Sequence, residues 1–308
     1  GALGGAQIVT VTGTMTWTGG SMNGSGRTVI SPGATLTIGS GEFLTLNGRT
    51  LDNAGNIIWT GAGPIELNGA VFTNRPGALF NAAATATIQF AGGAPRVDNA
   101  GTFRKSANTG TTTIGGSVPF ANYGTVDIQG GVLAMDGGYA STANALLNCG
   151  LGGKTPGTSY GQLQVSGSVV LNGGLSVNFT NGYFPKTNDS FTLLTAGTRI
   201  NTFASFTYPS NLVTMQLSNT PAAVLAQVTG AVSAPPPPFF MPPVISASNI
   251  LLTWKANSNF IYRLEYNPAL PASNWNAVPG DVTTSSNTAS KLDSLTPSNR
   301  YYRLQVLP

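Results

Sequence analysis

Residues 99–103 read Asn99-Ala100-Gly101-Thr102-Phe103, a turn signal followed by a β-prone stretch. The Asn-X-Gly signal recurs at Asn53-Ala54-Gly55 and at Asn122-Tyr123-Gly124, and a stretched form, Asn74-Arg75-Pro76-Gly77, lies between the first two. Successive asparagines are 21, 25 and 23 residues apart. A turn and a strand that recur at such a period are typical of stacked coils. The sequence therefore predicts a β-solenoid.

Additional turn signals lie between the asparagines, so each period of about 23 residues has room for three short strands, by the repeat logic of stacked architectures. We expect the amides of the repeat asparagines to stack inside the turn as a hydrogen-bonded ladder with a structural role. The members of this predicted ladder are Asn53, Asn74, Asn99 and Asn122.

Composition favours an all-β chain. Of the 308 residues, 40 are glycine and only 8% are charged, so the polar surface comes from neutral side chains suited to strands and turns. The net charge of +4 is spread thinly, which argues against a nucleic-acid partner. No apolar run is long enough for a membrane span. The start Gly1-Ala2-Leu3 reads as a mature N-terminus left by cleavage, and we expect a secreted, extracellular or cell-surface protein.

We expect four segments along the chain. Residues 1–27 alternate in polarity and predict a strand arm or cap, and residues 28–230 predict a parallel β-helix that ends in a C-terminal cap. Residues 231–243 contain four consecutive prolines and predict a polyproline linker. Residues 244–308 alternate as in a half-buried sandwich. Within the β-helix, the Ala- and Leu-rich stretch from Tyr139 to Asn148 predicts a short helix.

Two stretches resemble known families. Residues 160–167, 171–175, 191–197 and 202–204 are similar to the ends of autotransporter-type passenger domains, and this resemblance implies an exported, right-handed parallel β-helix of the adhesin type. Leu252-Thr253-Trp254, residues 262–266, Asn274-Trp275 and residues 300–304 resemble small fibronectin type III-like modules of secreted bacterial proteins.

Catalytic constellations are not evident. Histidine is absent and Cys149 is the single cysteine, so neither Ser-His nor Cys-His chemistry is available. Lyases need clustered carboxylates for calcium, and glycoside hydrolases need two that face each other. Asp52 and Asp98 precede equivalent repeat asparagines two coils apart, and we expect them to cap turns. We therefore predict no enzyme activity, no cofactor and no metal site.

Two aromatic groups are candidate contact surfaces. Phe239, Phe240 and Met241 are unusually apolar for a linker; they either pack against adjacent domains or dock on another subunit. Trp254 and Trp275 either form a sandwich core, the favoured interpretation, or make a glycan-binding platform.

The leading functional hypothesis is a non-catalytic extracellular structural protein that self-assembles head-to-tail into a filament or surface fibre, with itself as the partner. An open solenoid end exposes unpaired backbone groups, and a head-to-tail contact that does not close generates a filament. The alternative is a monomeric surface adhesin that binds cell-surface glycans. A polysaccharide-active β-helix enzyme ranks third.

Overall fold

The structure is a computed structural model that describes residues 1–308 except 107–108, 232–238, 259, 273, 296–298 and 308. None of the described residues is helical, and the chain folds as a parallel β-solenoid followed by small antiparallel sheets. The predicted all-β fold class is confirmed. Contacts divide the chain into two compact units: Gly1–Asn178, Thr187–Tyr208 and Met215–Thr229 form the first, and Phe179–Lys186, Pro209–Thr214 and Gly230–Pro308 form the second.

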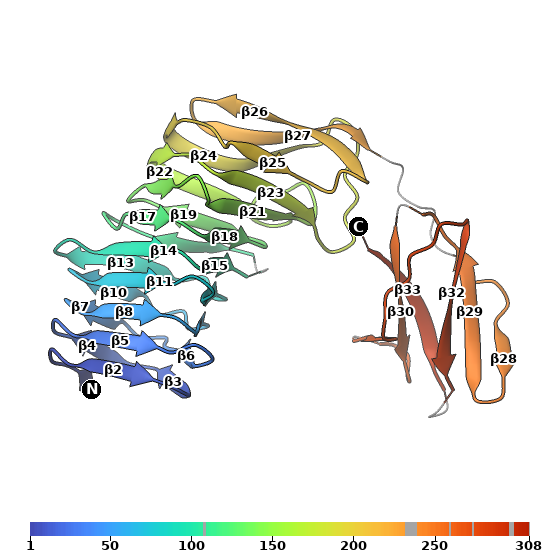
Figure 1. Ribbon diagram of the computed structural model, residues 1–308, viewed down its shortest axis with the longest axis horizontal. Coiled ribbons are helices and arrows are strands. Elements are labelled where there is room, and N and C mark those ends of the chain that lie inside the picture. The colour runs from blue at the N-terminus through green and yellow to red at the C-terminus, as the bar shows by residue number, and fades with distance from the viewer. Residues whose placement is uncertain (107–108, 232–238, 259, 273, 296–298, 308) are drawn as a thin grey trace. The chain divides into compact units, whose positions relative to one another are not determined.

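Three ladders of short parallel strands build the solenoid, one strand of each ladder per coil (Figure 1). The first ladder contains β1 (Ala2–Leu3), β4 (Gly20–Asn23), β7 (Leu44–Asn47), β10 (Ile65–Asn68), β13 (Thr87–Gly92), β16 (Thr111–Ile114) and β19 (Val132–Met135). The second contains β2 (Ile8–Val11), β5 (Arg27–Ile30), β8 (Thr50–Asn53), β11 (Val71–Asn74), β14 (Arg96–Asn99), β17 (Phe120–Asn122) and β20 (Tyr139–Ser141).

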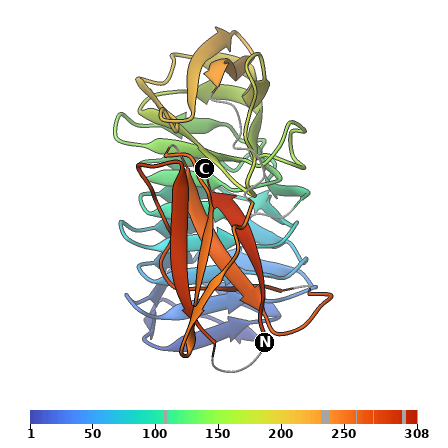
Figure 2. The same cartoon turned by 90° about the vertical axis from the view of Figure 1, so that its right-hand side faces the viewer.

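The third ladder is a nine-stranded sheet. It contains β3 (Thr14–Trp17), β6 (Thr35–Ile38), β9 (Asn56–Trp59), β12 (Leu79–Ala82), β15 (Thr102–Lys105), β18 (Thr125–Ile128), β21 (Leu146–Leu151), β23 (Gly174–Phe179) and β25 (Ser205–Thr207). Figure 2 shows the strands of the solenoid as stacked layers. In β6, β9, β12 and β15, residues alternate between buried and partly exposed, as expected for a sheet with one face in the core.

Aromatic rings fill the middle of the solenoid. Phe80 and Phe103 occupy the same position in successive coils and stack with their centroids 4.7 Å apart. Trp59 packs on Phe80 at 6.2 Å, and Phe120 continues the column from Phe103 to Tyr139. The register between coils therefore stacks aromatic side chains on aromatic side chains of the neighbouring coil. This stacking gives a continuous core in which each coil contacts its neighbours.

The stretch predicted as a short helix is extended instead. Tyr139–Ser141 forms β20 and Leu146–Leu151 forms β21, separated by a turn. Tyr139 pairs with Phe120, and Leu147 pairs with Val126, so both enter the interior column. The helix prediction was wrong because packing on the preceding coil outweighs the weak intrinsic preference of Ala and Leu.

The two ends of the solenoid are built differently. Residues 1–27, expected as an arm or cap, hold β1 to β4 and pair directly with the following coils. At the other end, the long strands β22 (Gln162–Val170) and β24 (Ser190–Ile200) each continue both the first and second ladders. There β27 (Ala223–Ala231) pairs antiparallel with β24, and β26 (Val213–Thr220) belongs to the same sheet.

The second unit contains two three-stranded antiparallel sheets. One sheet holds β28 (Val244–Ser246), β29 (Asn249–Lys255) and β32 (Thr288–Ser294); the other holds β31 (Asn276–Ala277), β30 (Ile261–Asn267) and β33 (Tyr301–Leu307). Ile250 and Leu252 from one sheet pack with Leu264 and Leu304 from the other. Residues 232–238 of the expected polyproline linker lie outside the described residues.

Candidate functional site

The repeat asparagines form a continuous chain of buried amides. Each Nδ2 group donates to the Oδ1 of the next asparagine: Asn53 to Asn74, Asn74 to Asn99 and Asn99 to Asn122, all at 2.8 Å. The second N–H of the same amide reaches a backbone carbonyl, for example that of Leu79 from Asn53 at 2.9 Å. All four side chains are fully buried. Because each amide hydrogen of the ladder has an acceptor and no side chain reaches solvent, the ladder stabilises the coil turns and offers no ligand site.

Glycine permits the turn that carries each asparagine. A Cβ atom on Gly55 would lie 2.3 Å from the carbonyl oxygen of Ser31, and one on Gly101 would lie 2.4 Å from that of Ala78. These oxygens belong to the preceding coil, so any side chain would push the two coils apart. The Asn-X-Gly pattern thus combines an inward amide with a close backbone approach.

The ladder ends in different ways. Asn53 aligns with the buried Ile30 of the preceding coil, which offers no polar partner. At the other end, the Asn122 Nδ2 group donates to the hydroxyl of Tyr139 at 3.1 Å. Burial raises the pKa of Tyr139 well above its ordinary value, so the phenol stays neutral.

Carboxylates on the solenoid pair with arginine. Asp52 and Asp98 both align with Thr73 on the intervening strand, as their sequence positions predict. They do not cap turns, however. The buried Asp52 carboxylate accepts from Arg27 and, at 2.6 Å, from Nε of Arg75, and Asp98 accepts from Arg96 at 2.8 Å. The turn-capping expectation was wrong because both side chains project outward beside these guanidinium groups. Within the described residues, no group of three or more Cys, Asp or Glu side chains could hold a metal ion.

The tryptophans do not form a common surface. Trp254 is fully buried beside Tyr262, so it cannot belong to a glycan platform. Trp275 is half-buried, with the guanidinium of Arg303 lying 4.6 Å from the centroid of its ring. The structure therefore separates the two residues that the sequence grouped together.

The linker aromatics also divide. Phe240 packs on Trp254 at 6.2 Å, and the Met241 N–H donates to the carbonyl of Thr253 at 2.8 Å, so this part of the chain pairs with the edge of β29. Phe239 remains 72% exposed. Phe240 and Met241 therefore pack as the first alternative predicts, and docking of Phe239 on another subunit stays a prediction.

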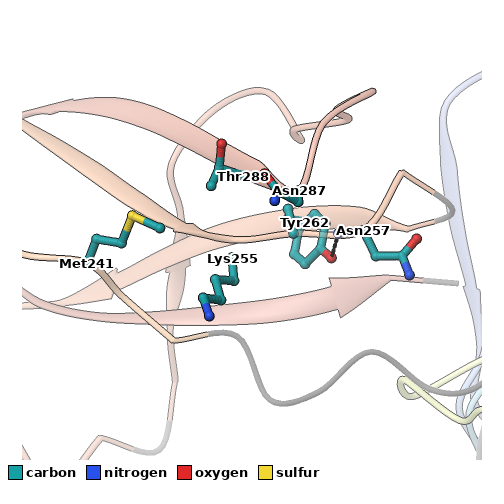
Figure 3. Close-up of a pocket in the computed structure, with 7 residues that line it drawn as sticks. Met241, Lys255, Asn257, Tyr262, Asn287 and Thr288 are labelled. Atoms are coloured by element: carbon teal, nitrogen blue, oxygen red, sulfur yellow. Dashed lines mark hydrogen bonds between the residues drawn. The ribbon is translucent and has the colours of Figure 1, made fainter.

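A pocket of about 390 Å³ lies beside this edge (Figure 3). Its lining includes Met241, Lys255, Asn257, Tyr262 and Thr288. The backbone N–H of Asn257 donates to the Tyr262 hydroxyl at 2.7 Å. In Figure 3, the Lys255 and Thr288 side chains point to opposite sides, so the polar groups do not converge on one point as they do in a specific small-molecule site.

The first coil, β1 to β3, is the most unusual surface of the solenoid. Leu3, Val9 and Met15 point inward but are only half-buried. Their aligned partners one coil later, Met22, Thr28 and Leu36, are at most 1% exposed. The interior of the solenoid is therefore open at this end, and Ile8 on the outer side is 63% exposed.

Backbone groups of the first coil are unpaired as well. The Ser31 N–H donates to the Val11 carbonyl at 2.9 Å, so the backbone groups of Val11, and of Val9 two residues before it, face the second coil. Neighbouring residues in a strand point their backbone groups in opposite directions. Those of Ile8 and Thr10 consequently point away from β5, the strand that pairs with β2, and away from the stack.

A buried arginine holds this coil in place. Arg49 in the third coil is fully buried and reaches back over two coils. Its guanidinium donates to the carbonyls of Gly5 and Gln7 in the first coil, both at 3.0 Å, and to that of Arg27 in the second coil at 2.8 Å. Sequence reasoning missed this residue because nothing near it in the sequence marks these acceptors.

Comparisons with known proteins leave the site to be interpreted from its geometry. No family model matches the chain, and neither a curated protein nor a solved structure matches it. In the part of the chain that the structure describes, there is no helix of the length and apolar character needed to cross a membrane.

Proposed function

We propose that this chain is a non-catalytic structural protein of the extracellular space or cell surface that assembles with copies of itself, head-to-tail, into a filament or surface fibre. The open first coil carries the proposal. It combines a free strand edge with half-buried interior side chains, and such an edge is a template for another chain. Burying Leu3, Val9 and Met15 against a second copy would recover the burial that their counterparts one coil later already have.

Other observations are compatible with this role. The ladder amides, the buried Asp52 and the aromatic column all have partners within the solenoid, which is compatible with a structural role. The likeness of residues 160–204 to right-handed autotransporter-type passenger domains, and of residues 252–304 to fibronectin type III-like modules, supports export to the cell surface.

A charge placed on the open edge tests the proposal. Thr10 is exposed on β2 in the first coil. Thr73 occupies the aligned outward-facing position on β11 in the fourth coil. Thr10→Lys adds a charge at the free edge, whereas Thr73→Lys adds the same charge within the stack. We expect wild-type protein and Thr73→Lys to form elongated assemblies by electron microscopy and sedimentation velocity, and Thr10→Lys to remain monomeric.

Two results would contradict the proposal. Assemblies of Thr10→Lys as long as those of the wild type would remove the edge from the contact. Wild-type protein that stays monomeric at every concentration would exclude self-assembly and leave the edge to a segment preceding residue 1 or to another protein.

A glycan-binding adhesin is the second candidate, and the pocket beside Met241 is the observation that favours it. Lys255 supplies a cation there, which would suit an acidic sugar. Binding on a glycan array that is lost in Lys255→Ala but retained in Lys291→Ala would support this function. Equal binding by both variants would exclude the pocket.

A further inference from the structure

The opposite end of the solenoid also carries a free strand edge. β27 pairs with β24, and β26 lies beside β27, with the Gln216 amide donating to Gln227 at 3.2 Å. β26 is the outermost strand at this end in Figure 1. Within the described solenoid strands it is the last of its sheet at this end (Figure 1), and Val213–Thr220 contains neither a charged residue nor a proline to block pairing.

The segments at both ends of the solenoid contain no charged side chains. Residues 1–26 contain no Asp, Glu, Lys or Arg, and neither do residues 200–254. All charged residues of the solenoid lie between these stretches, at positions 27–199. Two uncharged surfaces can meet without like-charge repulsion and without the cost of removing ions from water.

Another edge of this chain is protected. On the outer side of β29, Met241 pairs with Thr253 and Val244 pairs with Leu251, but Pro242 and Pro243 interrupt the row between them. Proline lacks a backbone N–H and prevents another strand from continuing the sheet. The outer edge of β29 is thus protected by proline against pairing with another strand, and β1, β2 and β26 contain no proline.

The two free edges also belong to one sheet, since β1, β2 and β26 are all strands of the 18-stranded sheet. We infer that the edge of β26 in one copy receives the first coil of the next copy, so that the sheet continues across the joint by strand addition. This inference rests on the proposed self-assembly. A contact between two first coils would leave the outer edge of β26 uncovered and would end at a dimer.

Two variants, each with one of the two edges blocked by a charge, test this contact between β26 and the first coil, called the joint below. Gln216→Lys charges the β26 edge, and Thr10→Lys charges the first coil. In a head-to-tail polymer, each variant alone has one blocked end and stays monomeric. A 1:1 mixture forms dimers and nothing longer, because the intact end of each variant meets the intact end of the other. Gln164→Lys on β22, an exposed glutamine within the stack, is the matched control and should assemble like the wild type.

The outcomes separate this inference from the proposed function. If the wild type does not self-associate, the proposed function fails. If the wild type associates but Gln216→Lys alone forms dimers or filaments, self-assembly stands and the β26 joint is wrong. Circular dichroism of each variant shows whether a monomer is folded.

Cross-linking gives a second measurement that does not depend on blocking. Thr10→Cys and Ser218→Cys place thiols on the two exposed edges, and the native Cys149 is buried. A short bismaleimide should join Thr10→Cys to Ser218→Cys in a mixture of the two proteins and should not join either variant to itself. A cross-link between two Thr10→Cys chains would overturn the inference in favour of a two-fold contact.

Discussion

Asparagine suits the inner turn of this solenoid because one short side chain contains both a donor and an acceptor. The amide of Asn99 accepts from Asn74 and donates to Asn122, and its second hydrogen reaches the carbonyl of Thr125 at 2.9 Å. A buried hydrogen bond adds only about 1 kcal/mol net, but a buried group left without a partner costs about 1–3 kcal/mol. The ladder is therefore most sensitive to removal of a central member.

Removing Asn99 should destabilise the solenoid by about 3 kcal/mol. Asn99→Ala deprives Asn122 of its donor and Asn74 of one acceptor, and leaves the Thr125 carbonyl without its side-chain partner. Asn47→Ala, at an exposed strand position, should change the free energy of unfolding by less than about 0.5 kcal/mol. Equilibrium denaturation in urea measures both values. Equal effects of the two substitutions would show that the ladder contributes nothing specific.

The buried thiol of Cys149 should lower the free energy of unfolding as the pH becomes alkaline. Burial, and secondarily the charge of Asp127, raises the pKa of its thiol from 9.0 to about 12. Between these values the unfolded chain loses the thiol proton and the folded chain keeps it. Stability is therefore fully present below pH 9 and falls as the pH rises, by about 1.4 kcal/mol per pH unit.

The variant Cys149→Ala should flatten this dependence. Between pH 10 and 11, its free energy of unfolding should fall less steeply than that of the wild type by about 1.3 kcal/mol per pH unit, while the two slopes agree below pH 8. Urea denaturation across this pH range provides the comparison. Parallel curves above pH 9 would mean that the thiol ionises as readily in the folded protein as in the unfolded chain.

At the scale of elements, each coil depends on its neighbours for its hydrogen bonds and its core. Coils in the middle have two neighbours, whereas the first coil has one and leaves Leu3, Val9 and Met15 half-buried. Arg49 compensates by spanning two coils with its guanidinium. Gly26 makes room for it, since a Cβ there would lie 2.7 Å from Nη1 of Arg49.

Arg49→Met should loosen the first coil. The substitution removes the donors that reach the Gly5 and Gln7 carbonyls, so amides in β2 and β3 should exchange with solvent at least tenfold faster, which corresponds to about 1.4 kcal/mol. Arg75→Met, at a surface arginine with a 44% exposed side chain, is the matched control and should leave these rates unchanged. Hydrogen exchange followed by mass spectrometry resolves the first coil from the rest. Unchanged exchange in Arg49→Met would mean that strand pairing alone holds this coil.

At the scale of the whole molecule, the distribution of charge bears on the proposed contact between copies. The middle of the solenoid carries paired charges such as Asp52 with Arg75, whereas residues 1–26 and 200–254 have none. Salt weakens contacts between exposed charges and leaves neutral contacts intact.

Self-association should therefore survive high salt. Raising the salt concentration from about 0.05 M to about 0.5 M spans a large change in screening length, yet the dissociation constant of the joint should not rise more than about threefold. Sedimentation velocity at several protein concentrations measures it. A tenfold or greater weakening would place charged residues in the contact and would argue against the neutral ends.

Much of the architecture was predictable from local patterns. The recurrence of Asn53, Asn74, Asn99 and Asn122 predicted coils of three strands, and alternation near Trp254 and Tyr262 predicted the small antiparallel sheets. Turn chemistry and strand alternation act over a few residues and repeat in every coil, so the sequence displays them directly.

Only the tertiary structure decided which surfaces remain open. The acceptors of Arg49 lie more than 40 residues away along the chain for Gly5 and Gln7, and the burial of Trp254 depends on Phe240 and Tyr262 from other segments. The same holds for the outer edges of β2 and β26, because whether a strand edge is covered depends on segments that are distant in sequence. Such contacts join residues far apart in sequence, and no local pattern records them.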